Sequence, residues 1–131
     1  MSNIAVSDLM TRKVSYVEPE TKVRNAIKQM ETEKISCLVV TEGDWPVGIL
    51  TERDIVNSCS RWSGSGGATI KVADIMSAPL VTLTDSASLH DVLDLTEQKS
   101  IRHIPVLTQN GSLAGIITQT DIVKACAKLI R

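Results

Sequence analysis

The sequence has 131 residues, of which 43 % are hydrophobic and 22 % charged, and its formal net charge is −1. A chain of this length forms one compact domain or two small fused repeats. The near-neutral charge excludes a global field that would attract nucleic acid or an anionic membrane. Phenylalanine is absent, so the core must be aliphatic. No apolar run approaches the ~18 residues of a membrane-spanning helix.

The cysteines and the first residues of the chain indicate the cellular compartment of the protein. Cys37, Cys59 and Cys126 are scattered and form no CxxC pair or cysteine–histidine cluster, which argues against a zinc site and a disulfide framework. The first residues lack the basic region and apolar core of a secretory signal peptide. We therefore expect a reduced, cytoplasmic protein without a metal.

The first half of the chain alternates short strands with helices. Apolar residues from Val23 to Met30 recur at the i, i+3, i+4, i+7 spacing of an amphipathic helix, and Thr21 is its candidate cap. Gly43-Asp44 is a turn signal between two apolar runs. The predicted elements are a helical turn at 6–10, strands at 14–17, 36–41 and 47–51, and a closing helix at 52–59.

The second half follows the same order. The helical spacing returns from Leu89, with Ser86 or Ser88 as its cap, and His90 on this helix is expected to be solvated. Asn110-Gly111 is a strong hairpin signal. The predicted elements are a helical turn at 72–76, strands at 80–83, 103–108 and 113–118, and a closing helix at 119–130.

Two motifs occur twice, which identifies an internal repeat. Val6-x-Asp8-x-Met10 recurs as Val72-x-Asp74-x-Met76, and Gly-Ile-Leu/Ile-Thr-x-x-Asp-Ile-Val occurs at 48–56 and at 115–123. The methionines are expected in the core or in a dimer contact. The pattern predicts an α/β (α+β) fold of two tandem β-α-β-β-α repeats. The predicted boundaries are repeat 1 at 1–59, a flexible Gly/Ser-rich linker at 60–71 that contains Trp62, and repeat 2 at 72–131.

These motifs, together with the Ile-Arg-His-Ile-Pro-Val run at 101–106, resemble a tandem pair of cystathionine-β-synthase-type (CBS) domains. The resemblance covers about residues 6–130, and repeat 1 departs from the pattern at Val39, where repeat 2 has Pro105. It implies two repeats packed through their sheets about a pseudo-twofold axis. It also implies two clefts that bind AMP, ADP, ATP or S-adenosylmethionine, and association into a homodimer.

The doubled Thr-x-x-Asp motif supplies the main candidate binding residues: Thr51 with Asp54, and Thr118 with Asp121. Each pair puts a hydroxyl at a strand-to-helix junction, where the helix N-terminus suits a phosphate, and a carboxylate that can accept both hydroxyls of a ribose. The same pattern is a capping box, which needs no ligand. Its occurrence in both copies favours binding in at least one. The resemblance implies that Thr contacts phosphate and Asp contacts ribose.

Arg102 and His103 could face a phosphate, or they could form a solvated strand edge. The resemblance implies that each cleft mixes both repeats. One cleft would contain Thr51, Arg53, Asp54, Val81, Thr82, Ile101, Arg102, His103 and Pro105. The other would contain Ser15, Tyr16, Ile35, Ser36, Cys37, Thr118 and Asp121. Because the first gathers the basic side chains, we expect it to be the better nucleotide site.

No nucleophile elbow, Walker lysine motif, metal-ligand set or Cys–His dyad occurs in the sequence, so we expect a protein that is not an enzyme and requires no cofactor. The predicted function is a regulatory adenine-nucleotide-binding module, which senses AMP, ADP or ATP and signals to a separate partner protein. Binding would order the 60–69 loop. The alternatives are a ligand-free structural dimerisation module and an S-adenosylmethionine sensor.

Overall fold

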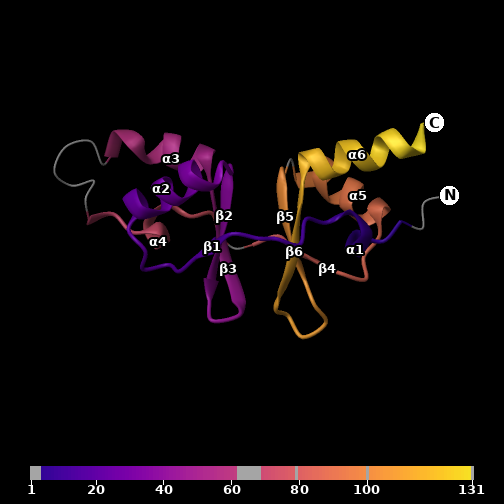
Figure 1. The fold of residues 1–131 in the computed structure, drawn as a ribbon, viewed down its shortest axis with the longest axis horizontal. Helices are drawn as coiled ribbons and strands as arrows, with labels where there is room; N and C mark the ends of the chain where they lie inside the picture. The colour runs from indigo at the N-terminus through magenta and orange to yellow at the C-terminus, as the bar shows by residue number, and fades with distance from the viewer. Residues whose placement is uncertain (1–3, 62–68, 79, 100, 131) are drawn as a thin grey trace. The chain divides into compact units, whose positions relative to one another are not determined.

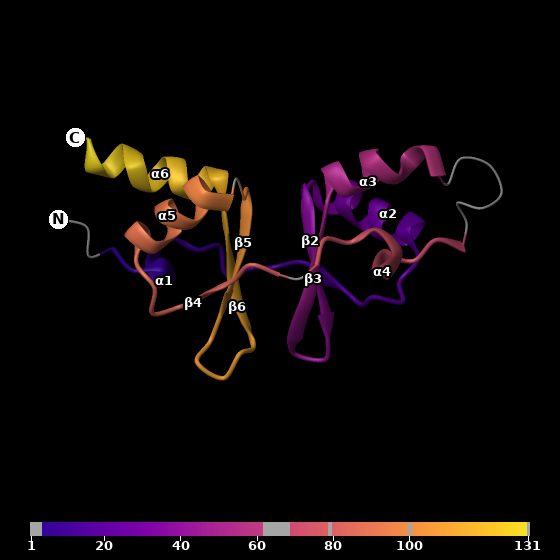
Figure 2. The same cartoon turned by 180° about the vertical axis from the view of Figure 1, so that it is seen from behind.

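The computed structural model describes residues 4–61, 69–78, 80–99 and 101–130 (Figure 1). Trp62 and most of the predicted linker lie outside these residues. The chain forms two compact units: unit 1 comprises residues 1–14 and 81–131, and unit 2 comprises residues 15–80. Each unit is a three-stranded sheet with its helices on one face, as Figure 2 shows from behind. The predicted α+β class is confirmed.

Unit 2 has a central strand, β2 (Cys37–Glu42), between two neighbours. β1 (Tyr16–Val17) pairs with it in parallel, and β3 (Trp45–Thr51) pairs with it as an antiparallel hairpin. Gly43 turns this hairpin with a φ of 63°. The helices of the unit are α2 (Val23–Glu33), α3 (Glu52–Ser58), the 3₁₀ turn η1 (Cys59–Arg61) and α4 (Val72–Ile75).

Unit 1 repeats this topology with β5 (His103–Leu107) in the centre. β4 (Leu83–Thr84) runs parallel to it, and β6 (Leu113–Thr118) runs antiparallel. Its helices are α1 (Val6–Leu9), α5 (Leu89–Lys99) and α6 (Gln119–Leu129).

The compact units do not coincide with the sequence repeats, because each unit contains the short helix that opens the other repeat. In unit 2 the backbone N–H of Val72 donates to Thr21 O, and the N–H of Val23 donates to Ile70 O, both at 2.8 Å. Val72 is fully buried.

The prediction that Thr21 caps α2 is wrong. The N-cap is Lys22 without a side-chain bond, because Ile70 satisfies the helix start through the backbone.

The opening segments also require the glycines of the hairpins. Met76 lies over Gly48 in unit 2, where an added Cβ would lie 2.6 Å from the methionine sulfur. Met10 lies over Gly115 in unit 1, where the same distance would be 2.7 Å. Only a residue without a side chain permits this approach.

Each unit has its own aliphatic core, as the composition predicts. The core of unit 2 is built from Val17, Ala26, Met30, Leu38, Val40, Leu50 and Val72. The core of unit 1 is built from Val6, Met10, Val92, Ile104, Val106 and Ile117. Met76 is half-buried against the core of unit 2. Met10, Met30 and Met76 therefore serve packing.

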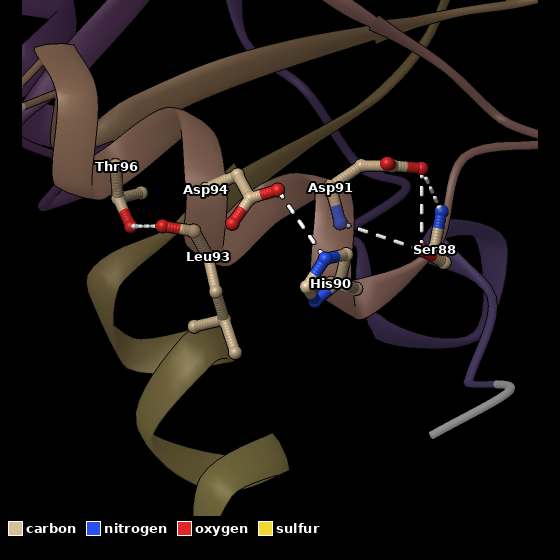
Figure 3. A network of polar contacts seen from close by, with 6 residues as sticks. All are labelled: Ser88, His90, Asp91, Leu93, Asp94 and Thr96. Carbon is tan, nitrogen blue, oxygen red and sulfur yellow. Dashed lines mark hydrogen bonds and ion pairs between the residues drawn. The ribbon is translucent and has the colours of Figure 1, made fainter. Parts of the chain in front are cut away.

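Helix α5 begins with a capping box (Figure 3). Asp91 Oδ2 accepts from Ser88 N at 2.9 Å and from Ser88 Oγ at 3.2 Å, and Asp91 N donates to Ser88 Oγ at 3.3 Å. The predicted cap Ser88 is thus confirmed. The hydrogen bonds from the Ser88 backbone and hydroxyl lower the pKa of the exposed Asp91 carboxyl. His90 is exposed as expected, and its Nε2 lies 3.3 Å from Asp94 Oδ2.

Candidate ligand site

The candidate site of unit 2 lies where β3 ends and α3 begins. Asp54 Oδ2 accepts from Thr51 N at 2.9 Å and from Thr51 Oγ1 at 3.1 Å. Asp54 N donates back to Thr51 Oγ1 at 3.3 Å, which completes a capping box. The capping interpretation of this motif is confirmed. It leaves Asp54 half-buried at the junction.

The junction between β6 and α6 in unit 1 has the same geometry. Asp121 Oδ2 accepts from Thr118 N at 2.9 Å and from Thr118 Oγ1 at 3.1 Å, and Asp121 N donates to Thr118 Oγ1 at 3.4 Å. The doubled motif therefore forms the same local structure twice.

A second hydroxyl reaches each carboxylate from the opening segment, and sequence reasoning missed both. Ser77 Oγ donates to Asp54 Oδ1 at 2.8 Å. Thr11 Oγ1 lies 3.2 Å from Asp121 Oδ1 and 3.3 Å from Oδ2. The available signal was a Ser or Thr directly after each Asp-x-Met motif. The long-range contact itself was not visible in the sequence.

The backbone holds both hydroxyl residues beside the sheet. Ser77 N donates to Ile49 O at 2.8 Å and Ile49 N donates to Ser77 O at 3.0 Å. Thr11 exchanges the same two bonds with Ile116, at 2.8 and 2.9 Å. The hydroxyls are therefore placed by a paired backbone and not by an unsupported loop.

The other predicted residues of unit 2 lie around the start of β2. Cys37 is opposite Thr51 in the register, and Ser36 O accepts from Glu52 N at 3.1 Å. The Ser15 hydroxyl donates to the Glu33 carboxylate. The remaining members of the set are Tyr16, which is 61 % exposed, Ile35, which packs against the core, and Arg53, which is exposed at the start of α3.

In unit 1 the position equivalent to Cys37 is His103, which lies opposite Thr118. Pro105 is buried in β5 opposite Ile116, and Arg102 is exposed. Val81, Thr82 and Ile101 are half-buried, as is His103. Within unit 1 the basic run is thus adjacent to the Thr118 junction. The grouping of residues from both repeats into two clefts stays a prediction.

Two observations limit the chemistry of the site. Burial raises the pKa of the Cys37 thiol from 9.0 to about 11, so this side chain stays neutral and is a poor nucleophile. Among the described residues, no group of His, Cys, Asp or Glu is arranged to hold a metal ion. The two junctions themselves offer a ligand hydroxyls, carboxylates and the backbone amides of the helix start.

Comparison with known proteins identifies the family. The model of the CBS domain matches residues 6–61 and 72–128. The chain belongs to the CBS-domain family. An uncharacterised protein of Methanopyrus kandleri is 34 % identical to this CBS protein over 125 residues, which are 95 % of this chain and 63 % of the relative. The CBS domain-containing protein YhcV of Bacillus subtilis is 33 % identical, over 90 % of this chain and 82 % of its own length.

Solved structures extend the likeness to the whole fold. CBSX2 of Arabidopsis thaliana, solved in complex with AMP, matches with a TM-score of 0.83 at 27 % identity and covers 98 % of this CBS chain and 100 % of its own. The inosine-5′-monophosphate dehydrogenase of Nitrosopumilus maritimus is 30 % identical, but only 21 % of that enzyme is covered. No helix in the described part of the chain is long and apolar enough to cross a membrane.

Proposed function

We propose that this CBS pair is a regulatory module that binds an adenine nucleotide (AMP, ADP or ATP) and signals its presence to a separate partner protein. The observation that carries the proposal is the Thr-x-x-Asp junction, which has the same geometry in both units. The AMP complex of CBSX2, a relative that matches the whole chain, supports an adenine nucleotide as the ligand.

The chemistry of the junction suits a nucleoside phosphate. A carboxylate has about four acceptor sites, so Asp54 and Asp121 each have capacity beyond the capping bonds to receive ribose hydroxyls. The start of a helix carries partial positive charge that favours phosphate. Since the net charge is −1, an anion must be held by such local groups. Arg53 precedes Asp54 directly, and His103 lies opposite Thr118 in the register of β5 and β6, with Arg102 next to it in the chain.

The experiment is calorimetric titration of the full chain with AMP, ADP, ATP and S-adenosylmethionine, repeated on Asp54→Ala and Asp121→Ala. The control is Asp91→Ala, because Asp91 forms the same capping box with Ser88 outside the candidate site. We expect binding of one adenine nucleotide that weakens at least tenfold in Asp54→Ala or Asp121→Ala and persists in Asp91→Ala. Binding that falls equally in all three variants would mean that the carboxylates only cap helices.

The second proposal is self-association into a homodimer, with or without ligand. Val56 on α3 and Val123 on α6 occupy equivalent positions of the two repeats and are 71 % and 66 % exposed, and Ile130 after α6 is 85 % exposed. Apolar side chains at such positions favour a protein contact. We expect light scattering to give a dimer mass for the wild type and a smaller mass for Val123→Lys. A Val123→Lys mass equal to the wild-type mass would exclude this face.

A further inference from the structure

The acceptor sites of Asp54 are already largely occupied from within the chain. Oδ2 accepts from the backbone N–H and the hydroxyl of Thr51, and Oδ1 accepts from the hydroxyl of Ser77 at 2.8 Å. A carboxylate has about four acceptor sites, two on each oxygen. One site on Oδ1 therefore remains. A ribose presents two neighbouring hydroxyls and needs two sites, so one of the internal donors must give way.

The two Thr51 bonds belong to the capping box and are tied to the helix start. Ser77 is not part of that box and is exposed, so its hydroxyl is the donor that can turn away to water. We propose that the hydroxyl after the methionine of each opening segment, Ser77 in unit 2 and Thr11 in unit 1, is an internal competitor for the carboxylate that receives the ribose. This inference rests on the proposed function, because it assumes that the ribose binds there.

The competition connects the ligand to the opening segment. When the sugar takes Oδ1, Ser77 loses its side-chain bond, and its segment is held by the backbone bonds to Ile49 and by Met76 over Gly48. The bond from Ser77 to Asp54 is a side-chain hydrogen bond that joins this segment to the ligand junction. Ligand binding therefore attaches the opening segment less firmly to the junction. A partner protein could detect this change.

The two units differ in the strength of the competitor. The Ser77 hydroxyl makes one short bond to a single oxygen, whereas the Thr11 hydroxyl straddles both oxygens of Asp121 at 3.2 and 3.3 Å. Longer and divided hydrogen bonds are weaker. The internal competitor therefore opposes ligand binding more strongly at Asp54 than at Asp121.

The test compares AMP with 2′,3′-dideoxy-AMP, which lacks both ribose hydroxyls, by titration of the wild type, Ser77→Ala and Thr11→Val. We expect AMP to bind Ser77→Ala about threefold to tenfold more tightly than the wild type, the gain in Thr11→Val to be smaller, and the dideoxy analogue to bind all three equally. The control is Ser86→Ala, which removes an exposed hydroxyl that pairs with Thr84 instead of a site carboxylate. A structural defect would weaken binding of both nucleotides and could not produce this selective gain.

The outcomes separate the two claims. If the wild type binds AMP and Ser77→Ala binds it equally or more weakly, the competition is wrong and the proposed function stands. An equal gain for the dideoxy analogue would also overturn the competition, because that analogue cannot displace the hydroxyl. If neither the wild type nor Ser77→Ala binds AMP, ADP or ATP, the proposed function is wrong and the inference falls with it.

Discussion

Replacement of Gly115 by alanine tests how the opening segment attaches to the sheet. An added Cβ would lie 2.7 Å from Met10 Sδ and 2.8 Å from Thr11 O. The methionine side chain can move aside, but Thr11 O belongs to a backbone that is paired with Ile116. At Gly48 the backbone atom is farther away, with Ser77 O at 3.1 Å and Met76 Sδ at 2.6 Å. Gly115→Ala should therefore cost more than Gly48→Ala.

Forced overpacking costs typically 1–3 kcal/mol, and we place Gly115→Ala near the upper end and Gly48→Ala near the lower end. The assay is urea unfolding followed by circular dichroism, in which a loss of about 2 kcal/mol lowers the midpoint by roughly 1 M. In the double variant Gly48→Ala/Met76→Ala, part of the stability that Gly48→Ala loses should return, because the second substitution removes the sulfur that the new methyl group meets. Midpoints of Gly115→Ala and Gly48→Ala equal to that of the wild type would refute the close packing of methionine on glycine.

Two further predictions concern titrating groups. Because burial raises the pKa of Cys37 from 9.0 to about 11, its contribution to stability is complete below pH 9.0 and is lost as the pH rises toward 11. At about pH 8 iodoacetamide should modify the exposed Cys59 well before Cys37, as measured by peptide mass spectrometry, and faster modification of Cys37 would contradict its burial. The lowered pKa of Asp91 stabilises the fold above the ordinary value of 3.8, and this contribution is lost as the pH falls through the folded-state pKa. Asp91→Ala should thus have a lower unfolding midpoint than the wild type at neutral pH, with the difference shrinking in acid; a difference that persists unchanged at low pH would contradict this.

Local sequence patterns predicted most elements because each is a short amphipathic or apolar segment with a clear turn. The predicted strand at 113–118 coincides with β6, and the closing helix predicted at 119–130 corresponds to α6. The capping boxes at both junctions were also visible, since a capping box is a contact between residues three apart.

The features that the sequence did not predict all depend on long-range contacts. Nothing local indicates that Ile70 satisfies the start of α2, and the local pattern therefore predicts Thr21 as the cap. The contacts of the Ser77 and Thr11 hydroxyls could not be predicted for the same reason, because these residues are distant in sequence from the aspartates that they contact. The motifs indicate the order of the two repeats, but they do not indicate that each compact unit contains the opening segment of the other repeat.

The most direct test of the proposed function is titration of AMP into the full chain and into Asp54→Ala, Asp121→Ala and the capping control Asp91→Ala. We predict that the wild type and Asp91→Ala bind AMP with similar affinity, and that at least one of the two junction variants binds it at least tenfold more weakly. Equal AMP binding by all four proteins, or none by a folded wild type with any adenine nucleotide, would contradict a nucleotide site at the Thr-x-x-Asp junctions.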